Sequence, residues 1–433
     1  MDSLVKKHEH KDYNEVFHLL LLALVMLSSV FYYKIILLSN NMIYALQLAV
    51  VGLMFVSLLF QQIFWKFRLT KHHFTMPILL IMLGVFTGMI SAYAFHGQDI
   101  QISLWAQRFM YFYLFYFFLH ILKIPVEQIE KLVFVFALVY VGAYLLQYAV
   151  YPRELFEVRL DPSRGTLRIF LPGLSFLFLS YFISLQKVLY KNSLKHALLM
   201  LLFLSVIVMS GGRQLLANIS LVSLLALLFS RKVKSRYLLY LVALLAAFAI
   251  FVLFQEIIRN LVEISREQTI NSARITRLRT TEFFLTDFFP NDLSYITGNG
   301  EAHQWSSYGM EIHSYKVYRG YYLSDIGFIG EYTKYGIFFV IGGLMLMVKA
   351  LRHRHPRNFM YVKLYLFSSL ISLPLGNIFS QPYSIAALCL LLYIIDLQKT
   401  KEAGAKKPWR PKVYFPALEN DKAGYSVKSK TSP

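Results

Sequence analysis

The run Ser-Gly-Gly-Arg at 210–213 has the residue types of an anion-binding turn. Gly211 and Gly212 allow the backbone to turn tightly and to expose its amides. Arg213 follows directly and opens the next apolar stretch, where backbone N–H groups and the positive end of the helix dipole favour negative charge. The run therefore predicts a site for an anionic group such as phosphate.

A second glycine turn precedes side chains that can exchange protons. Gly298 and Gly300 flank an asparagine in the run Thr-Gly-Asn-Gly-Glu at 297–301. Imidazole and carboxylate groups are common general acids and bases. The candidates after this turn are His303, His313 and Asp325.

These residues belong to a chain whose composition indicates a membrane protein. Of its 433 residues, 57% are hydrophobic and 16% are charged, whereas about a quarter of the residues in an ordinary soluble protein are charged. The apolar residues fall in blocks of about 20, the length that crosses a bilayer of ~30 Å. We predict an all-α polytopic protein with twelve spans, near 16–37, 42–65, 75–95, 102–122, 131–150, 169–187, 194–210, 213–230, 237–257, 335–349, 359–377 and 380–397.

The distribution of basic residues predicts how these spans are oriented. Of the 44 Lys and Arg residues, 29 lie in the two termini and in alternate connections, and 22 of these are lysines. Because positive charge is retained in the cytoplasm, both termini are expected there. The predicted order is a cytoplasmic N-terminus at 1–15, nine spans over 16–257, a large external loop at 258–334, three spans over 335–397 and a basic tail at 398–433.

The remaining basic residues are mostly arginines on the predicted external side. They comprise 12 arginines and 3 lysines. Retention of positive charge in the cytoplasm does not explain why arginine replaces lysine on the external side. The planar guanidinium of arginine binds two phosphate oxygens at once and is less strongly hydrated than the ammonium of lysine. We therefore interpret the set as a diphosphate site, although contacts with lipid headgroups and external carboxylates would also explain it. The favoured members are Arg108, Arg168, Arg213, Arg274 and Arg277.

Two external connections are long enough to build such a site. The connection near 151–168 carries four arginines, and 258–334 is the longest stretch without a predicted span between two spans. If 259–277 were one continuous helix, four of its arginines would lie within about 80° of one face: Arg259, Arg266, Arg274 and Arg277. A solvated surface helix that breaks near Asn271 and Ser272 fits the same residues.

At this combination of features the sequence resembles the O-antigen ligase and O-antigen polymerase family, integral membrane enzymes that handle undecaprenyl-diphosphate-linked saccharides. The matching parts are the Ser-Gly-Gly-Arg turn at 210–213, the external loop before the third-last span, the Gly-Asn-Gly turn at 298–300, and the Gly-Phe-Ile-Gly and Tyr-Gly pattern at 327–336. The resemblance implies a protein of the bacterial inner membrane with its active face in the periplasm.

The resemblance also implies the chemistry. A sugar hydroxyl attacks an anomeric carbon while a lipid diphosphate leaves, so cations are needed at the leaving group and a base at the hydroxyl. Arginines can supply the cations without a metal or other cofactor, and the sequence has no Asp-x-Asp motif of nucleotide-sugar enzymes. The expected base is His313, which matches the loop histidine of ligases, or Asp325, which resembles polymerase-type relatives.

Several functions compete with this interpretation. The spacing after His313 and the segment around Asp325 favour a polymerase, whose acceptor is a second lipid-linked repeat, over a ligase, whose acceptor is another glycan such as lipid A core. A flippase for lipid-linked oligosaccharides would also need a cationic cavity, but the chain shows no internal repeat. A net charge of +20 does not indicate nucleic acid in so apolar a chain, so membrane lipids and the lipid-linked saccharide are the expected partners.

Overall fold

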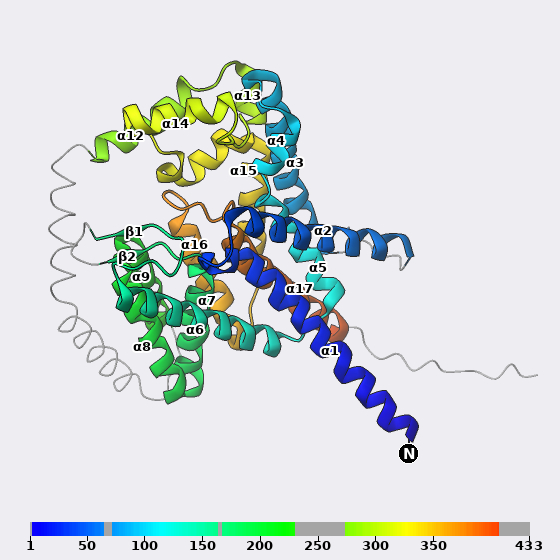
Figure 1. The fold of residues 1–433 in the computed structure, drawn as a ribbon. Coiled ribbons are helices and arrows are strands. Elements are labelled where there is room, and N and C mark those ends of the chain that lie inside the picture. The colour runs from blue at the N-terminus through cyan, green and yellow to red at the C-terminus, as the bar shows by residue number, and fades with distance from the viewer. Residues whose placement is uncertain (1, 65–71, 163–166, 230–272, 407–433) are drawn as a thin grey trace, which may run out of the picture.

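The computed structural model describes residues 2–64, 72–162, 167–229 and 273–406. Within these ranges the chain forms a helical bundle with a smaller helical cap at one end, the upper end in Figure 1. The only strands in these ranges are two short ones, paired as an antiparallel hairpin in which Asp161 lies opposite Arg168. The structure is thus mostly helical, as predicted.

The bundle is built mainly from the first half of the described chain and from its last helices. In chain order its first elements are α1 (Asp2–Ser29), η1 (Phe31–Lys34), α2 (Asn40–Phe64), α3 (Thr75–His96), α4 (Ile100–Ala106), η3 (Met110–Tyr113), α5 (Leu114–Leu122), α6 (Val126–Val150), β1 (Leu160–Asp161), β2 (Arg168–Ile169), α7 (Leu174–Lys191), α8 (Leu194–Met209) and α9 (Arg213–Phe229). After the cap follow α15 (Gly327–Arg352), η5 (Arg357–Phe359), α16 (Met360–Ser372) and α17 (Pro382–Lys406).

The cap precedes α15 and has its own small core. It consists of α12 (Ala273–Thr286), α13 (Asp292–Thr297), α14 (Ser307–Arg319) and η4 (Leu323–Ile326). The core joins α12, α14 and η4 and is separate from the main core; its four buried apolar side chains are Phe284, Phe288, Tyr308 and Ile326. The described part of the predicted external loop is therefore folded into helices.

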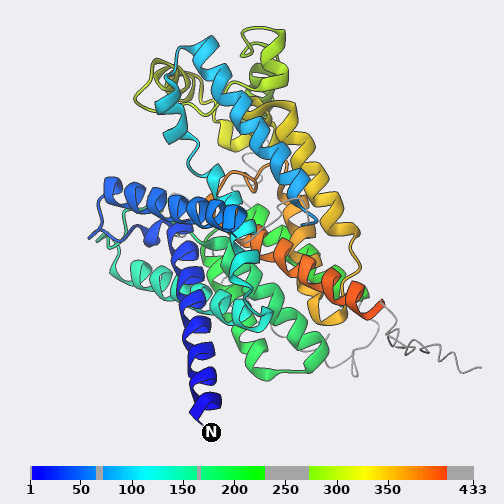
Figure 2. The same cartoon turned by 90° about the vertical axis from the view of Figure 1, so that its right-hand side faces the viewer.

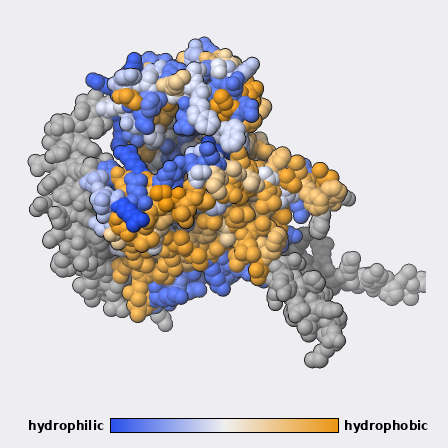
Figure 3. Space-filling model, viewed as in Figure 1, coloured by the Kyte–Doolittle hydropathy of each residue, from blue (hydrophilic) through white to orange (hydrophobic). Residues whose placement is uncertain are grey.

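Five helices in the described residues are long and apolar enough to cross a membrane, namely α2, α3, α6, α15 together with η4, and α17. Shorter apolar helices lie at Glu15–Ser29, Met110–Leu122, Leu194–Met209 and Gln214–Leu228. Many large apolar side chains are exposed on the helices of the bundle, among them Val56, Phe60, Phe86, Leu138, Leu146, Leu344 and Val348. Figure 3 shows a broad orange belt of hydrophobic residues below the polar cap. This surface is compatible with an all-α membrane protein.

Helix α17 occupies the centre of the bundle. Every residue from Ile385 to Ile395 is at most 1% exposed, whereas α2, α3, α6 and α15 each bury less than half of their apolar windows. A helix that is apolar on all sides must be surrounded by protein or lipid. The aromatic residues of η3 and α5 pack around α17, and Tyr113 and Tyr393 donate hydrogen bonds to the carbonyls of Phe379 and Ile124.

Helix α15 packs along α3 and is broken at Gly336, whose φ is 69° and ψ is −167°. A break of this kind leaves carbonyls of the preceding turn without their helical donors. The amides of Asn299 and Gly300 donate to the carbonyls of Thr333 and Lys334 at 2.9 and 2.7 Å. The glycine turn at 298–300 thus completes the hydrogen bonding of the kinked helix.

Close packing explains why glycine occupies this turn. A Cβ on Gly298 would lie 2.4 Å from the carbonyl oxygen of Lys334, and one on Gly300 would lie 2.5 Å from the carbonyl oxygen of Gly88. Both glycines have positive φ, at 76° and 75°. Beside the turn, Glu301 accepts hydrogen bonds from Lys334 and Tyr335 at 2.9 Å.

Several described helices begin and end near the predicted spans, and others differ. The helix of the first predicted span, 16–37, runs from Asp2 to Ser29, and the helix of the span predicted at 359–377 ends at Ser372. The stretch predicted as one span at 102–122 is divided into α4, η3 and α5. The span predicted at 169–187 begins only at Leu174, because the β-hairpin takes up the preceding residues, and the span predicted from 335 begins as a helix at Gly327. The predicted span at 237–257 lies outside the described residues, and the total of twelve stays a prediction.

Candidate functional site

A cleft of about 1450 Å³ lies between the cap and the bundle, and we refer to it as the cleft. Its lining comes from five parts of the chain that are far apart in sequence: the β-hairpin, the start of α7, the turn before α9, the cap elements α12 and η4, and the segment 365–384. Figure 3 shows the surface hollowed beneath the polar cap, above the apolar belt. The cleft thus lies at the border between polar and apolar surface.

The β-hairpin forms a wall with two arginines. Register places Asp161 beside Arg168, and the two side chains form an ion pair with Nη1 and Oδ2 3.4 Å apart. The Arg168 guanidinium lies 4.8 Å from the centre of the Phe170 ring, and that of Arg159 lies 5.3 Å from the same ring. The carboxylate and the ring hold the Arg168 fork in place at the cleft.

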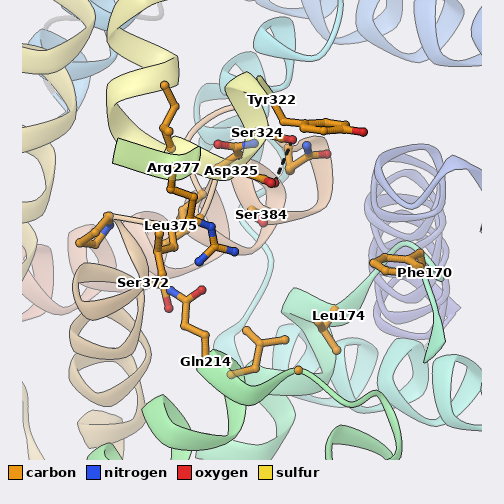
Figure 4. A pocket seen from close by; sticks show the side chains of 18 of the residues that line it. Phe170, Leu174, Gln214, Arg277, Tyr322, Ser324, Asp325, Ser372, Leu375 and Ser384 are labelled. Carbon is orange, nitrogen blue, oxygen red and sulfur yellow. Dashed lines mark hydrogen bonds between the residues drawn. The ribbon is translucent and has the colours of Figure 1, made fainter. Parts of the chain in front are cut away.

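The cap supplies the facing wall. Arg277 is exposed on α12 and lines the cleft together with Thr280 and Thr281. Figure 4 shows its guanidinium pointing into the cleft. Asp325 in η4 also lines it and is exposed, and its Oδ1 accepts a hydrogen bond from the Ser324 hydroxyl at 3.4 Å.

The Ser-Gly-Gly-Arg turn borders the same cleft. Gly212, Gln214 and Leu215 line it, and Gly211 has a φ of 63°, which reverses the chain after α8. Helix α9 begins at Arg213, so amides of its first turn have no partner within the helix. The side chain of Arg213 lies outside the described residues. The backbone of the predicted anion-binding turn is therefore at the cleft.

Hydroxyl and amide groups of α16, α17 and the segment between them form the floor. Ser372 accepts a hydrogen bond from Asn218 at 2.5 Å, and the hydroxyls of Ser175 and Ser384 lie 2.9 Å apart. Asn377 and Gln381 also line this floor. Such donors and acceptors suit the hydroxyl groups of a saccharide.

Three predicted side chains are thus brought together, namely Arg168, Arg277 and Asp325. His313 is exposed on α14 and does not line the cleft. Gly298 and Gly300 lie at the kink of α15, also away from the cleft lining. Helix α12 includes the backbone of Arg274, but the side chain of Arg274 lies outside the described residues, as do Arg259 and Arg266.

Arg108 occupies a different part of the surface, between α4 and η3. Its guanidinium lies over the rings of Tyr44 and Phe109, at 4.2 and 4.4 Å, and donates to the Trp105 carbonyl at 2.9 Å. Burial and the nearby Arg108 charge both lower the pKa of His303. These contacts give Arg108 a packing role outside the cleft.

Sequence reasoning missed part of the site. The segment 373–381 was assigned mostly to a span ending at 377, although Pro374 and Gly376 are residues that commonly end a helix. Asp161, whose carboxylate holds Arg168, is one of the external carboxylates that the sequence offers only as general partners of the arginines. Its position opposite Arg168 depends on the register of the two strands, which residue types alone do not specify.

One group of potential metal ligands occurs in the described residues, remote from the cleft. Ligand atoms of His72, His120 and Asp396 lie within 4.8 Å of one another. His72 precedes α3 and Asp396 lies near the end of the α17 span, whereas the start of α17 borders the cleft. The expectation that the cleft works without metal stays a prediction.

Comparison with known proteins assigns no family: no protein-family model matches the sequence, and no curated protein matches it significantly.

Proposed function

We propose that the protein transfers a saccharide from an undecaprenyl-diphosphate carrier to a sugar hydroxyl, and that the reaction takes place in the cleft. The observation that carries this proposal is the convergence of Arg168, Arg277 and Asp325 with the Ser-Gly-Gly-Arg turn around one space of about 1450 Å³. These groups were predicted from sequence and lie on separate segments. Their convergence is what a diphosphate and a reacting hydroxyl would require.

The arginines and the turn would bind the diphosphate. In the bond-breaking step the bond between the anomeric carbon and the diphosphate oxygen breaks, and the electron pair remains on the leaving diphosphate. Arg277 on the cap and Arg168 on the hairpin face this space from two sides and stabilise the added charge. The amides at the start of α9 add donors of the same kind.

Asp325 would act as the base. It accepts the proton of the attacking hydroxyl as the new glycosidic bond forms. We prefer it to His313, because Asp325 lines the cleft and His313 does not. The preference for Asp325 also favours a polymerase, whose acceptor is a second lipid-linked repeat, and a ligase acting on lipid A core is the alternative within the same chemistry.

The proposed setting is the bacterial inner membrane, with twelve spans, both termini in the cytoplasm and the cleft on the periplasmic side. The apolar belt beside the cleft supports a lipid-borne donor, because the carrier chain stays in the bilayer while its diphosphate reaches the polar border. The location of 29 of the 44 basic residues in the termini and alternate connections supports the orientation.

Purified protein in liposomes with a lipid-linked saccharide repeat tests the proposal. Formation of longer or transferred glycan supports it, whereas movement of the intact donor across the bilayer without a covalent change would establish a flippase instead. The glycan of a deletion strain separates the two enzymes. Single repeats on the final acceptor indicate a lost polymerase, and long chains left on the carrier indicate a lost ligase.

A chelator tests the expectation about metal. Since the arginines supply the positive charge, we expect EDTA treatment to leave the transfer rate unchanged. Loss of activity that a divalent cation restores would contradict this expectation and would direct attention to a metal at the diphosphate.

A further inference from the structure

Besides the cleft, the structure contains a smaller pocket at the opposite end of α15. We refer to it as the basic pocket. It has a volume of about 400 Å³. Helix α15 starts beside the cleft and ends at Arg352, while α17 starts beside the cleft and reaches the pocket with Lys399. Figure 2 shows both helices, yellow and red, running toward the lower right of the molecule.

The lining of the basic pocket is entirely basic. Within the described residues its side chains are His73, Lys349, Arg352, His353, Arg354 and Lys399. Four of these carry a permanent positive charge, and none of the lining residues is acidic. Charges of one sign around so small a space favour the binding of an anion.

His73 shows how these cations affect the pocket. Its Nε2 accepts a hydrogen bond from the Lys399 ammonium at 2.8 Å, and its carbonyl accepts one from Lys349 at 3.4 Å. Burial and the two lysines lower the pKa of His73, while Asp396, which accepts from the His73 amide at 3.3 Å, opposes this. Burial and the neighbouring cations thus favour the neutral imidazole, whose Nε2 accepts from Lys399.

The position of the basic pocket indicates the source of an anion. Helices α15 and α17 are both apolar enough to cross a membrane, and the pocket lies where these spans end, at Arg352 and Lys399. The end of a membrane span lies at the level of the lipid phosphates. Arg352 and Arg354 are exposed at this level and present guanidinium forks that match phosphate oxygens.

We propose that the basic pocket binds the phosphate of an anionic phospholipid in the leaflet opposite the cleft. This proposal is independent of the transfer reaction. In the neighbouring group of His72, His120 and Asp396, the Asp396 carboxylate accepts hydrogen bonds from Tyr116 and the His73 amide and so holds the wall of the pocket.

Native mass spectrometry of the full chain in a neutral detergent tests the proposal, with phosphatidylglycerol, phosphatidylcholine and inorganic phosphate as probes. The variant Arg352→Gln/Arg354→Gln removes two exposed cations of the pocket. The matched control, Lys191→Gln/Arg357→Gln, removes two exposed cations outside the lining; Arg357 is near α7, since its carbonyl accepts from Gln186. We expect phosphatidylglycerol to bind the pocket variant about tenfold more weakly than the wild type, and the control within about twofold of it.

Two results would overturn the proposal: equal binding of phosphatidylglycerol by the pocket variant and the wild type, or equal binding of phosphatidylcholine and phosphatidylglycerol by the wild type. If inorganic phosphate binds the wild type and displaces the lipid, the pocket is a site for soluble phosphate, and the lipid assignment is wrong. If the double variant does not fold, Lys399→Gln provides the same comparison and should weaken phosphatidylglycerol binding about threefold.

Discussion

The two ends of α15 both gather arginine side chains, yet their surroundings differ. At the cleft, Arg168 is paired with Asp161 and Arg277 shares the lining with Asp325, so positive and negative groups alternate around about 1450 Å³. At the basic pocket the lining within the described residues holds no carboxylate, and the space is about 400 Å³.

This difference separates two ways of using a cation. A pocket of one sign can bind an anion but lacks a group that accepts a proton. A cleft with both signs can hold a leaving diphosphate and activate a hydroxyl at the same time. If the comparison is correct, substitutions at the cleft should alter transfer, and those at the basic pocket should alter lipid binding.

Asp325→Asn gives the largest expected effect. The amide keeps the size of the side chain but cannot accept the hydroxyl proton, so we expect transfer to slow by about 10³-fold. Initial rates of glycan formation in liposomes provide the measurement. Glu282→Gln, an exposed cap carboxylate outside the cleft lining, is the control and should retain wild-type rates. Full activity of Asp325→Asn would remove the base from the mechanism.

Gly298→Ala should destabilise the protein at the end of α15 that lies beside the cleft. The added Cβ meets the Lys334 carbonyl at 2.4 Å and the residue has a φ of 76°. We expect the free energy of unfolding to fall by about 3 kcal/mol. Thermal unfolding in detergent measures this against Gly52→Ala, whose Cβ would have nothing within 4 Å. Equal melting temperatures for the two variants would show that the glycine turn does not support the kink.

Arg277→Lys separates charge from geometry. The lysine keeps the positive charge but loses the fork that binds two phosphate oxygens, so we expect transfer to slow by about tenfold. Arg279→Lys on the same helix is exposed and outside the lining, and it should behave as the wild type. A wild-type rate for Arg277→Lys would show that the cap arginine does not bind the diphosphate bidentately.

His313→Ala should have the smallest effect, a change of no more than about twofold in the transfer rate. The imidazole is exposed on α14 and does not line the cleft. Initial rates measured beside Asp325→Asn distinguish the two candidate bases. A loss as large as that of Asp325→Asn would favour the histidine that the resemblance to ligases indicates.

The sequence by itself determined the helical character, the limits of several helices and the residue types that line the cleft. Blocks of about 20 apolar residues specify α2, α3, α6, α15 and α17 because only a helix satisfies its own backbone in an apolar environment. The excess of arginine over lysine on the predicted external side pointed to Arg168 and Arg277, because the ability to bind two phosphate oxygens depends on the guanidinium itself.

Only the tertiary structure decided which of these residues meet. The two glycine turns are similar in sequence, yet 210–213 borders the cleft, while 298–300 completes the hydrogen bonds of kinked α15. Likewise Asp325 lines the cleft and His313 does not, although both follow the second turn. The pattern of apolar residues indicates where each segment forms a helix in an apolar environment. A site depends instead on contacts between segments far apart in the chain, and these contacts form only when the helices pack.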